Sequence, residues 1–203
     1  LTRWHELPGA QRSDRAVLGL GRGNPLKDFP LTRAAYEALA EPRPELWLFG
    51  IEPEVADGIA GPVTYHRRPS DAEVNGLLNT ATVFLQTSRH EGFCLPILEA
   101  MAAGAPVVCT DAHGNRDFCR DGVNCLIPVR HPHAVRDAVQ RLLTDPDLRA
   151  RLADGGRETA ERYALSRKLD ELDAFYRDLA ERRASGRMPD PVVRAVRTRS
   201  GVA

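Results

Sequence analysis

Two glutamates on either side of a turn carry the clearest chemistry in this sequence. Residues 88–108 read SRHEGFCLPILEAMAAGAPVV, with Glu91 in a predicted loop and Glu99 inside a predicted helix. Gly92 and Pro96 stand between them, and proline suits the first position of a helix because it lacks an N–H group. Backbone N–H groups at a helix start bind anions, and carboxylates accept hydrogen bonds from hydroxyls. The spacing therefore predicts a site for an anion and a polyol, such as a sugar, a ribose and a diphosphate.

Two cations follow a predicted strand upstream of this stretch. Arg22 and Lys27 lie in the glycine-rich loop after the apolar run 16–21. Arginine offers a planar fork to phosphate oxygens and lysine a mobile point charge, so the pair can stabilise a departing diphosphate. We expect no metal in this task. The triplet Asp-Pro-Asp at 145–147 lies between two amphipathic segments and predicts a helix cap rather than a metal site.

Further side chains are candidates for contact with the same ligand. Tyr65 and Arg67 follow a predicted strand at the place expected for a nucleobase; in the alternative, Tyr65 is a core residue and Arg67 a surface residue. His90 either contacts the sugar or only lines its loop. The full predicted binding set is Arg22, Lys27, Tyr65, Arg67, His90, Glu91, Gly92, Phe93, Cys94, Leu95 and Glu99, of which Arg22, Lys27 and Glu91 are the catalytic candidates.

Apolar runs alternate with helical segments along the chain. Strands are predicted at 16–21, 45–50, 63–66, 82–87 and 106–110, and helices at 30–41, 70–78 and 96–104. A short helix at 115–120 and a weak strand at 125–127 follow, and the texture beyond 132 is helical and amphipathic. This order predicts a doubly wound, Rossmann-like α/β fold with a parallel sheet and extra C-terminal helices. Ligands of such folds bind beyond the carboxyl ends of the strands.

Composition limits the partners and the compartment. The 203 residues carry 28 basic and 28 acidic side chains, which argues against nucleic acid as a partner. No apolar run approaches the length of a membrane span and no signal peptide opens the sequence, so we expect a cytoplasmic protein. We expect an incoming linker at 1–15, one binding domain at 16–183, and a tail or linker at 184–203.

The cysteines predict ordinary buried thiols. Cys94, Cys109, Cys119 and Cys125 form no closely spaced pair of the zinc-binding type. A bridge between Cys119 and Cys125 is the open alternative.

Several motifs together resemble one family. The stretch 88–108 is similar to the pattern S-x-x-E-G-F-G-L-P-x-L-E-A-M-A-x-G-x-P-V-V of retaining GT-B glycosyltransferases of family 4, with Cys94 in place of a glycine. Residues 121–126 resemble its D-G-x-N-G-x-L phrase, residues 143–149 its L-x-D-P-x-L-R phrase, and the Arg22/Lys27 loop its diphosphate pair. The match covers about residues 16–180, the C-terminal, donor-binding half of such enzymes.

The resemblance implies a function and a division of roles. A nucleotide-diphospho-sugar would be the donor, with no cofactor, and its sugar would pass with retention to an acceptor hydroxyl in polysaccharide or glycoconjugate biosynthesis. Glu91 would hold the sugar and Glu99 the ribose. The partner would be an N-terminal Rossmann-like acceptor domain, absent from this sequence, through which any peripheral membrane association would occur. Alone, the domain is expected to be inactive.

Other functions remain to be compared with this one. A non-catalytic nucleotide-sugar-binding module would use the same residues, and so would a GT-B-type sugar-nucleotide epimerase. A phosphorylase would need a lysine placed for pyridoxal phosphate, which the sequence does not suggest. A dinucleotide-binding dehydrogenase is disfavoured because Asn24 replaces the third glycine of the run that begins at Gly19.

Overall fold

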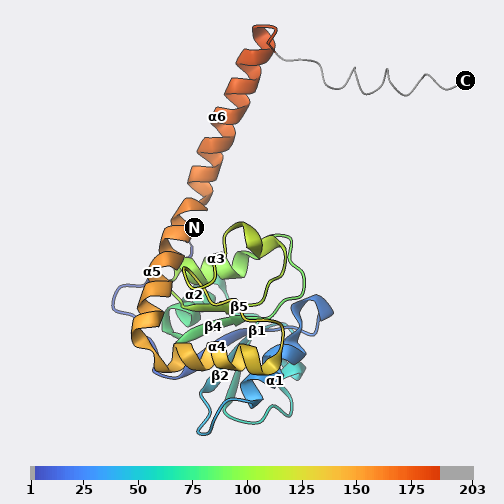
Figure 1. The fold of residues 1–203 in the computed structure, drawn as a ribbon, viewed down its shortest axis with the longest axis vertical. Helices are drawn as coiled ribbons and strands as arrows, with labels where there is room; N and C mark the ends of the chain where they lie inside the picture. Colours follow the sequence, from blue (N-terminus) through green and yellow to red (C-terminus); the bar gives the residue numbers. More distant parts are fainter. Residues whose placement is uncertain (1–2, 188–203) are drawn as a thin grey trace, which may run out of the picture. The chain divides into compact units, whose positions relative to one another are not determined.

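The core of the molecule is a five-stranded parallel sheet. The computed structural model describes residues 3–187. The strands are β1 (Ala16–Gly21), β2 (Glu45–Gly50), β3 (Val63–Arg67), β4 (Val83–Gln86) and β5 (Val107–Cys109). Their spatial order is β3-β2-β1-β4-β5, so β1 pairs with both β2 and β4 and the strand order reverses there (Figure 1). A reversal of this kind opens a ligand crevice at the carboxyl ends of the strands.

Helices cover both faces of the sheet. On one face, α1 (Phe29–Glu37) and α4 (Pro132–Thr144) pack against one core cluster; on the other, α2 (Asp71–Thr80) and α3 (Leu95–Ala102) pack against a second (Figure 1). Neighbouring residues of a strand point to opposite faces, so Val17 joins the first cluster and Leu18 the second. Both are fully buried. The predicted doubly wound α/β fold is confirmed.

The helix next to the two glutamates has defined ends. It begins one residue before the predicted start, so Pro96 is its second residue. At its end, Gly104 takes a φ of 67°, its N–H donates to Met101 O, and Ala105 N–H donates to Ala100 O. This is the Schellman arrangement, in which a glycine just after a helix allows the last carbonyls to be satisfied.

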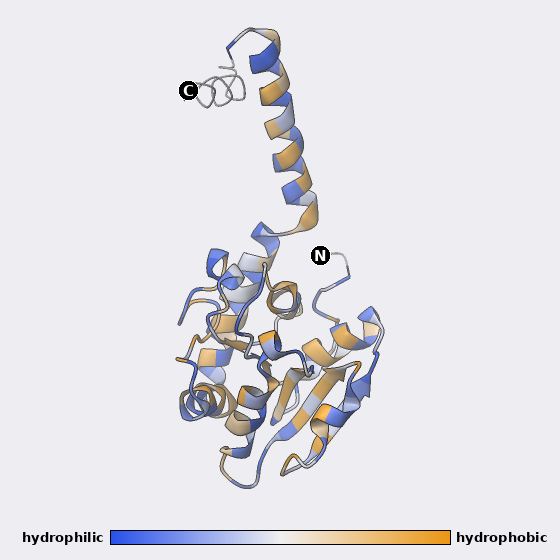
Figure 2. Ribbon diagram, turned by 90° about the vertical axis from the view of Figure 1, so that its right-hand side faces the viewer, coloured by the Kyte–Doolittle hydropathy of each residue, from blue (hydrophilic) through white to orange (hydrophobic). Residues whose placement is uncertain are grey.

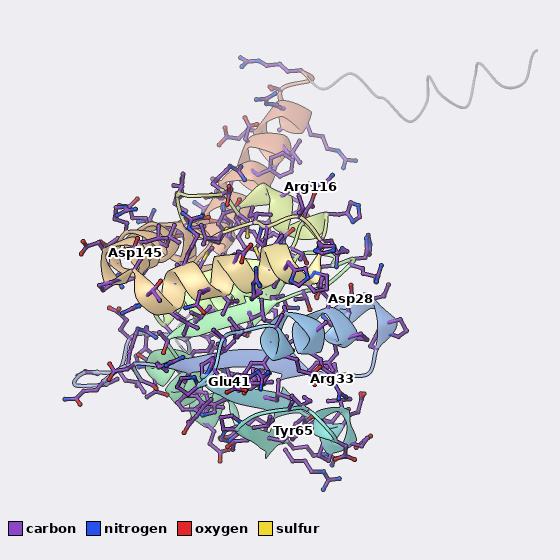
Figure 3. The ribbon with its side chains drawn as sticks, turned by 60° about the horizontal axis from the view of Figure 1, so that its bottom comes forward. Asp28, Arg33, Glu41, Tyr65, Arg116 and Asp145 are labelled. Atoms are coloured by element: carbon purple, nitrogen blue, oxygen red, sulfur yellow. The ribbon has the colours of Figure 1, made fainter. Side chains whose placement is uncertain are left out.

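Other helix boundaries follow local capping chemistry. The side chain of Ser70 accepts from Glu73 N–H while the Glu73 carboxylate accepts from Ser70 N–H, which completes a capping box at the start of α2. Asp145 Oδ1 accepts from Leu148 N–H at 2.8 Å and caps α5 (Pro146–Arg162) (Figure 3). The interpretation of the Asp-Pro-Asp triplet as a helix cap is confirmed.

The segment after β5 differs from the prediction. Instead of a helix at 115–120, a single 3-10 turn, η3 (Gly114–Asp117), is present. The predicted weak strand at 125–127 is reduced to isolated bridges, of Leu126 with Val108 and of Cys125 with Asp121. Two further 3-10 turns are η1 (Pro25–Lys27) and η2 (Pro53–Ala56).

The described chain divides into two compact units after Tyr163. The first contains the sheet, and residues before β1 are bonded to α2, for example Ser13 N–H to Thr80 O at 2.7 Å. The second contains α6 (Leu165–Ala184), along which apolar and polar residues alternate (Figure 2). Most of the predicted tail at 184–203 lies outside the described residues. None of the described helices combines the length and apolar character needed to cross a membrane.

Candidate functional site

The loops that follow β1 and β4 meet through a lysine and a glutamate. Lys27 Nζ donates to Glu91 Oε1 at 2.7 Å, with the two side chains 27% and 11% exposed. Ser88 Oγ and Gln86 Nε2 also donate to this oxygen, at 2.6 and 3.2 Å. The structure therefore brings together two of the three predicted catalytic side chains. Because all three donors use Oε1, the other oxygen of Glu91 accepts no hydrogen bond among residues 3–187.

One buried acceptor beside Glu91 is left without a partner. Gln86 is the last residue of β4 and is buried, and its amide nitrogen binds Ser88 and Glu91. Its Oε1 has no hydrogen-bond partner in the described part of the chain. An orphan buried acceptor is costly unless a ligand or water donates to it. The sequence pattern gave no reason to single out Gln86.

An arginine ties the site loops to one another. Arg130 donates to Asp28 Oδ2 at 3.1 Å, Thr87 O at 2.8 Å, Ser88 O at 2.5 Å and Asp111 O at 3.0 Å. These acceptors lie in the loops after β1, β4 and β5. Sequence reasoning missed Arg130, because nothing in the sequence shows that a residue just before α4 reaches three loops at the carboxyl edge.

The central acceptor of this arrangement is Asp28. Its side chain is 6% exposed and is paired with Arg130 and Arg89, and the residue takes a φ of 49° at the start of α1 (Figure 3). Arg89 N–H also donates to Leu26 O at 2.7 Å. The paired charges and the backbone bond hold the loop with Lys27 against the loop with Glu91.

The turn that enters α3 presents backbone donors. The N–H groups of Phe93, Cys94 and Leu95 donate to no other residue of the described chain. Cys94 takes a φ of 72°, the left-handed region that favours glycine, which explains why a glycine is usual there in the pattern that the sequence resembles. Burial and the nearby Glu91 raise the pKa of the Cys94 thiol to about 12, so it stays neutral.

The second glutamate lies one turn into α3. Glu99 is half-buried and has no ion-pair partner among the residues that the structure describes. Burial, and then the nearby charge of Asp71, raise its pKa. A half-buried carboxylate of this kind gains from hydroxyl donors that a ligand supplies.

The candidates for contact with a nucleobase lie on β3, the edge strand on the far side of β1 from the Glu91 loop. Tyr65 is half-buried in β3; its hydroxyl donates to Gly21 O and accepts from Glu52 N–H, both at 2.9 Å (Figure 3). The hydroxyl thus joins the ends of β1 and β2, next to the half-buried Arg22, whose charge acts on Tyr65. Arg67 ends β3 and is exposed. The structure brings Arg22 and Tyr65 together but sets Arg67 apart from the Glu91 loop by two strands.

Two histidine rings lie next to each other at the Glu91 loop. His90 Nδ1 and His113 Nδ1 lie 3.1 Å apart. The backbone beside them is paired as well, since Glu91 N–H donates to Ala112 O at 2.9 Å and Gly114 N–H donates to Glu91 O at 3.2 Å. A Cβ on Gly114 would collide with the carbonyl of Gly92, so this close approach requires glycine. This contact holds the Glu91 loop, with His90 and Gly92, against the turn at 112–114.

The arrangement defines a class of protein. The domain is doubly wound, and the carboxyl edge of its sheet carries a lysine–glutamate pair and a helix start with backbone N–H groups that are free within residues 3–187. This is the architecture of a GT-B glycosyltransferase domain. The family model "Glycosyl transferases group 1" matches residues 14–159, and the chain belongs to this family. The predicted recognition is thereby confirmed.

Relatives and solved structures agree with this membership. The chain is 30% identical to a phosphatidyl-myo-inositol mannosyltransferase of Mycobacterium leprae over 86% of this chain and 50% of that protein. It is 34% identical to a D-inositol 3-phosphate glycosyltransferase of Stackebrandtia nassauensis over 68% of this chain and 31% of that protein. Sucrose-phosphate synthase of Thermosynechococcus elongatus has a similar fold, with a TM-score of 0.73 and 22% identity over 89% of this chain and 50% of that one. The chain thus spans about a quarter to a half of the length of the relatives it matches.

Proposed function

We propose that this chain is the donor-binding half of a retaining glycosyltransferase. It would bind a nucleotide-diphospho-sugar, whose sugar passes to an acceptor hydroxyl with retention of configuration. The Lys27–Glu91 pair at the start of α3 carries the proposal, because it sets a cation for phosphate beside a carboxylate for sugar hydroxyls. A structure of the similar Anabaena HepE, with a TM-score of 0.68 and 20% identity over 78% of this chain and 48% of that one, was solved with UDP and glucose.

The diphosphate would bind between the cations and the turn. Lys27 and Arg22 supply charge, and the N–H groups of residues 93–95 supply directed donors at the positive end of α3. As the bond between the sugar and the diphosphate breaks, negative charge grows on the departing oxygen. Fixed donors aimed at that charge lower the barrier because they need not reorganise. The proposed reaction therefore uses no metal ion or cofactor.

The sugar and the ribose would use the two glutamates. Glu91 is held by Ser88 and Gln86 through one oxygen, which leaves its other oxygen for a sugar hydroxyl. The orphan Oε1 of Gln86 is a second acceptor for such a hydroxyl. Glu99 would accept the two ribose hydroxyls, which compensates the cost of its burial. The acceptor would be held by a second, Rossmann-like domain outside this sequence.

Calorimetry with UDP, GDP, ADP and dTDP tests donor binding. At least one of them should bind, and Arg22→Ala, Lys27→Ala and Glu99→Ala should each weaken binding by about tenfold or more, since charged contacts contribute about 1.5–3 kcal/mol. Glu158→Ala, an exposed glutamate of α5, is the matched control and should leave binding unchanged. A folded chain that binds none of the four would refute the proposal.

A non-catalytic binding module predicts the same result in that experiment. The two functions separate when this chain is joined to its acceptor domain. A transferase then releases free nucleoside diphosphate from the donor in the presence of acceptor, and Lys27→Ala lowers the rate. A binding module retains the donor intact.

A further inference from the structure

Three cysteines form a compact group at the end of β5 and in the segment that follows it. Cys109 ends β5, Cys119 follows η3, and Cys125 lies one turn further along the chain. Their sulfur atoms all lie within 4.8 Å of one another, and those of Cys109 and Cys119 are 3.8 Å apart. The three residues are at most 4% exposed. Within residues 3–187, no other group of three or more His, Cys, Asp or Glu side chains converges in this way.

The backbone fixes the three positions independently of the sulfurs. Cys109 N–H donates to Leu126 O and Leu126 N–H to Val107 O, both at 3.0 Å, which places Cys125 beside β5. Cys119 N–H donates to Asn115 O at 2.8 Å at the end of η3. A ligand set that is held by the fold in advance costs little ordering entropy when it binds an ion.

The separations suit metal ligation. Sulfurs that lie about 2.3 Å from a tetrahedral zinc ion are about 3.8 Å from one another, the separation of Cys109 and Cys119. Three thiolates around a divalent cation leave a net charge of about −1, smaller than that of the four-cysteine zinc sites that proteins bury routinely. Asn115 Nδ2, 3.7 Å from Cys109 Sγ, adds a donor that stabilises sulfur in its charged form.

We propose that Cys109, Cys119 and Cys125 form a binding site for a thiophilic metal cation, with Zn²⁺ as the representative of the class. Soft thiolate ligands without a carboxylate or imidazole select such cations over Mg²⁺ or Ca²⁺. The bound ion is structural, because it joins the end of β5 to the two turns that follow. This site is separate from the proposed donor chemistry, and its test does not depend on it.

The cysteine group is connected to the Glu91 loop through the contacts of Asn115. The Asn115 amide contacts Cys109 Sγ, donates to Thr110 O at 2.9 Å and accepts from Ala112 N–H at 3.0 Å. Ala112 O in turn accepts from Glu91 N–H. A cation bound to the cysteines therefore stabilises the loop that pairs with Glu91.

Titration of the reduced chain with Cd²⁺ tests the site directly. The ultraviolet absorption of thiolate-to-cadmium charge transfer should saturate at one equivalent per chain, and Zn²⁺ should compete for it. Cys119→Ser and Cys125→Ser should each weaken binding by about 100-fold or more. Cys94→Ser is the matched control: this buried thiol lies outside the sulfur group, so the titration should be unchanged.

A second readout uses the unaltered chain. In partly denaturing urea, bound Zn²⁺ should protect Cys109, Cys119 and Cys125 from a thiol reagent while Cys94 is labelled, and chelation should remove this protection. The proposal is overturned if the folded, reduced chain binds no stoichiometric Cd²⁺ or Zn²⁺, or if labelling is unchanged by Zn²⁺. A disulfide between two of the three cysteines in freshly purified protein would also overturn it.

Discussion

Arg130 offers a quantitative test of how the site is held. Its guanidinium reaches Asp28 and the backbone carbonyls of Thr87, Ser88 and Asp111 at once. Arg130→Lys keeps a positive charge for Asp28, but an ammonium group cannot span four acceptors in three loops. At least two hydrogen bonds are lost, which at about 0.5–1.5 kcal/mol each lowers the free energy of unfolding by about 1–3 kcal/mol.

The chain supplies a matched control for this variant. Arg12 donates to the carbonyls of Leu78, Ala81 and Ala103 at 2.7–2.9 Å. Ala81 and Ala103 precede β4 and β5, so Arg12 works at the amino edge of the sheet, away from the site. Arg12→Lys should lower stability by a similar amount, about 1–3 kcal/mol.

The two variants separate positioning from stability. Urea unfolding should show comparable losses, whereas calorimetry should show nucleoside diphosphate binding weakened about tenfold by Arg130→Lys alone, equivalent to about 1.4 kcal/mol. If both variants weaken binding equally, or if neither does, Arg130 acts only on the stability of the fold and does not position the site.

Three further predictions follow from single contacts. Burial raises the pKa of Glu99, so its ionised form is lost at a higher pH than for an ordinary glutamate, and nucleotide affinity should fall as the pH is lowered through that range. Glu99→Gln should remove this pH dependence in calorimetric titrations at several pH values. If the dependence of affinity on pH is the same in the variant, Glu99 does not have this role. Gly104→Ala should lower the free energy of unfolding by about 1–2 kcal/mol, because Gly104 has a φ of 67°. Gly76→Ala, in the middle of α2 where a Cβ meets no other atom, should raise the free energy of unfolding by about 0.5–1 kcal/mol. Chemical unfolding that shows both variants changing stability in the same direction would contradict this. Asp145→Ala should lower the stability of the chain by about 1 kcal/mol, because α5 loses its N-cap hydrogen bond. Thermal unfolding should show a smaller loss of stability for Asp147→Ala, since no hydrogen bond from the Asp147 side chain to the helix start is present in residues 3–187. A larger loss for Asp147→Ala than for Asp145→Ala would refute the role of the cap.

The sequence predicted the elements whose signals are local. Strands β1 and β2 have the predicted bounds, since apolar runs end at Gly21 and Gly50. The cap of α5 is also as predicted, because Asp145 acts on backbone within a few residues of itself. The segment at 114–126 was predicted poorly, since its shape depends on pairing with β5 rather than on its own pattern.

Spatial proximity across the sheet was the part of the site that the sequence could not supply. Lys27 and Glu91 were chosen by residue type and by resemblance, and the fold brings them into contact. Arg130 and Gln86 were missed because their roles arise only where loops from different strands meet. The cysteine group was missed for the same reason: no two of its members have the close spacing of a zinc motif, yet β5 and the following turns bring their sulfurs together.

The most direct test is a crystal structure of the chain with whichever nucleoside diphosphate binds most tightly. We expect the diphosphate to lie within hydrogen-bonding distance of Lys27 and the N–H groups of residues 93–95, with the ribose hydroxyls on Glu99. Lys27 should then contact phosphate oxygen rather than Glu91 alone. A nucleotide bound away from the start of α3, with the Lys27–Glu91 pair unchanged, would contradict the proposed donor site.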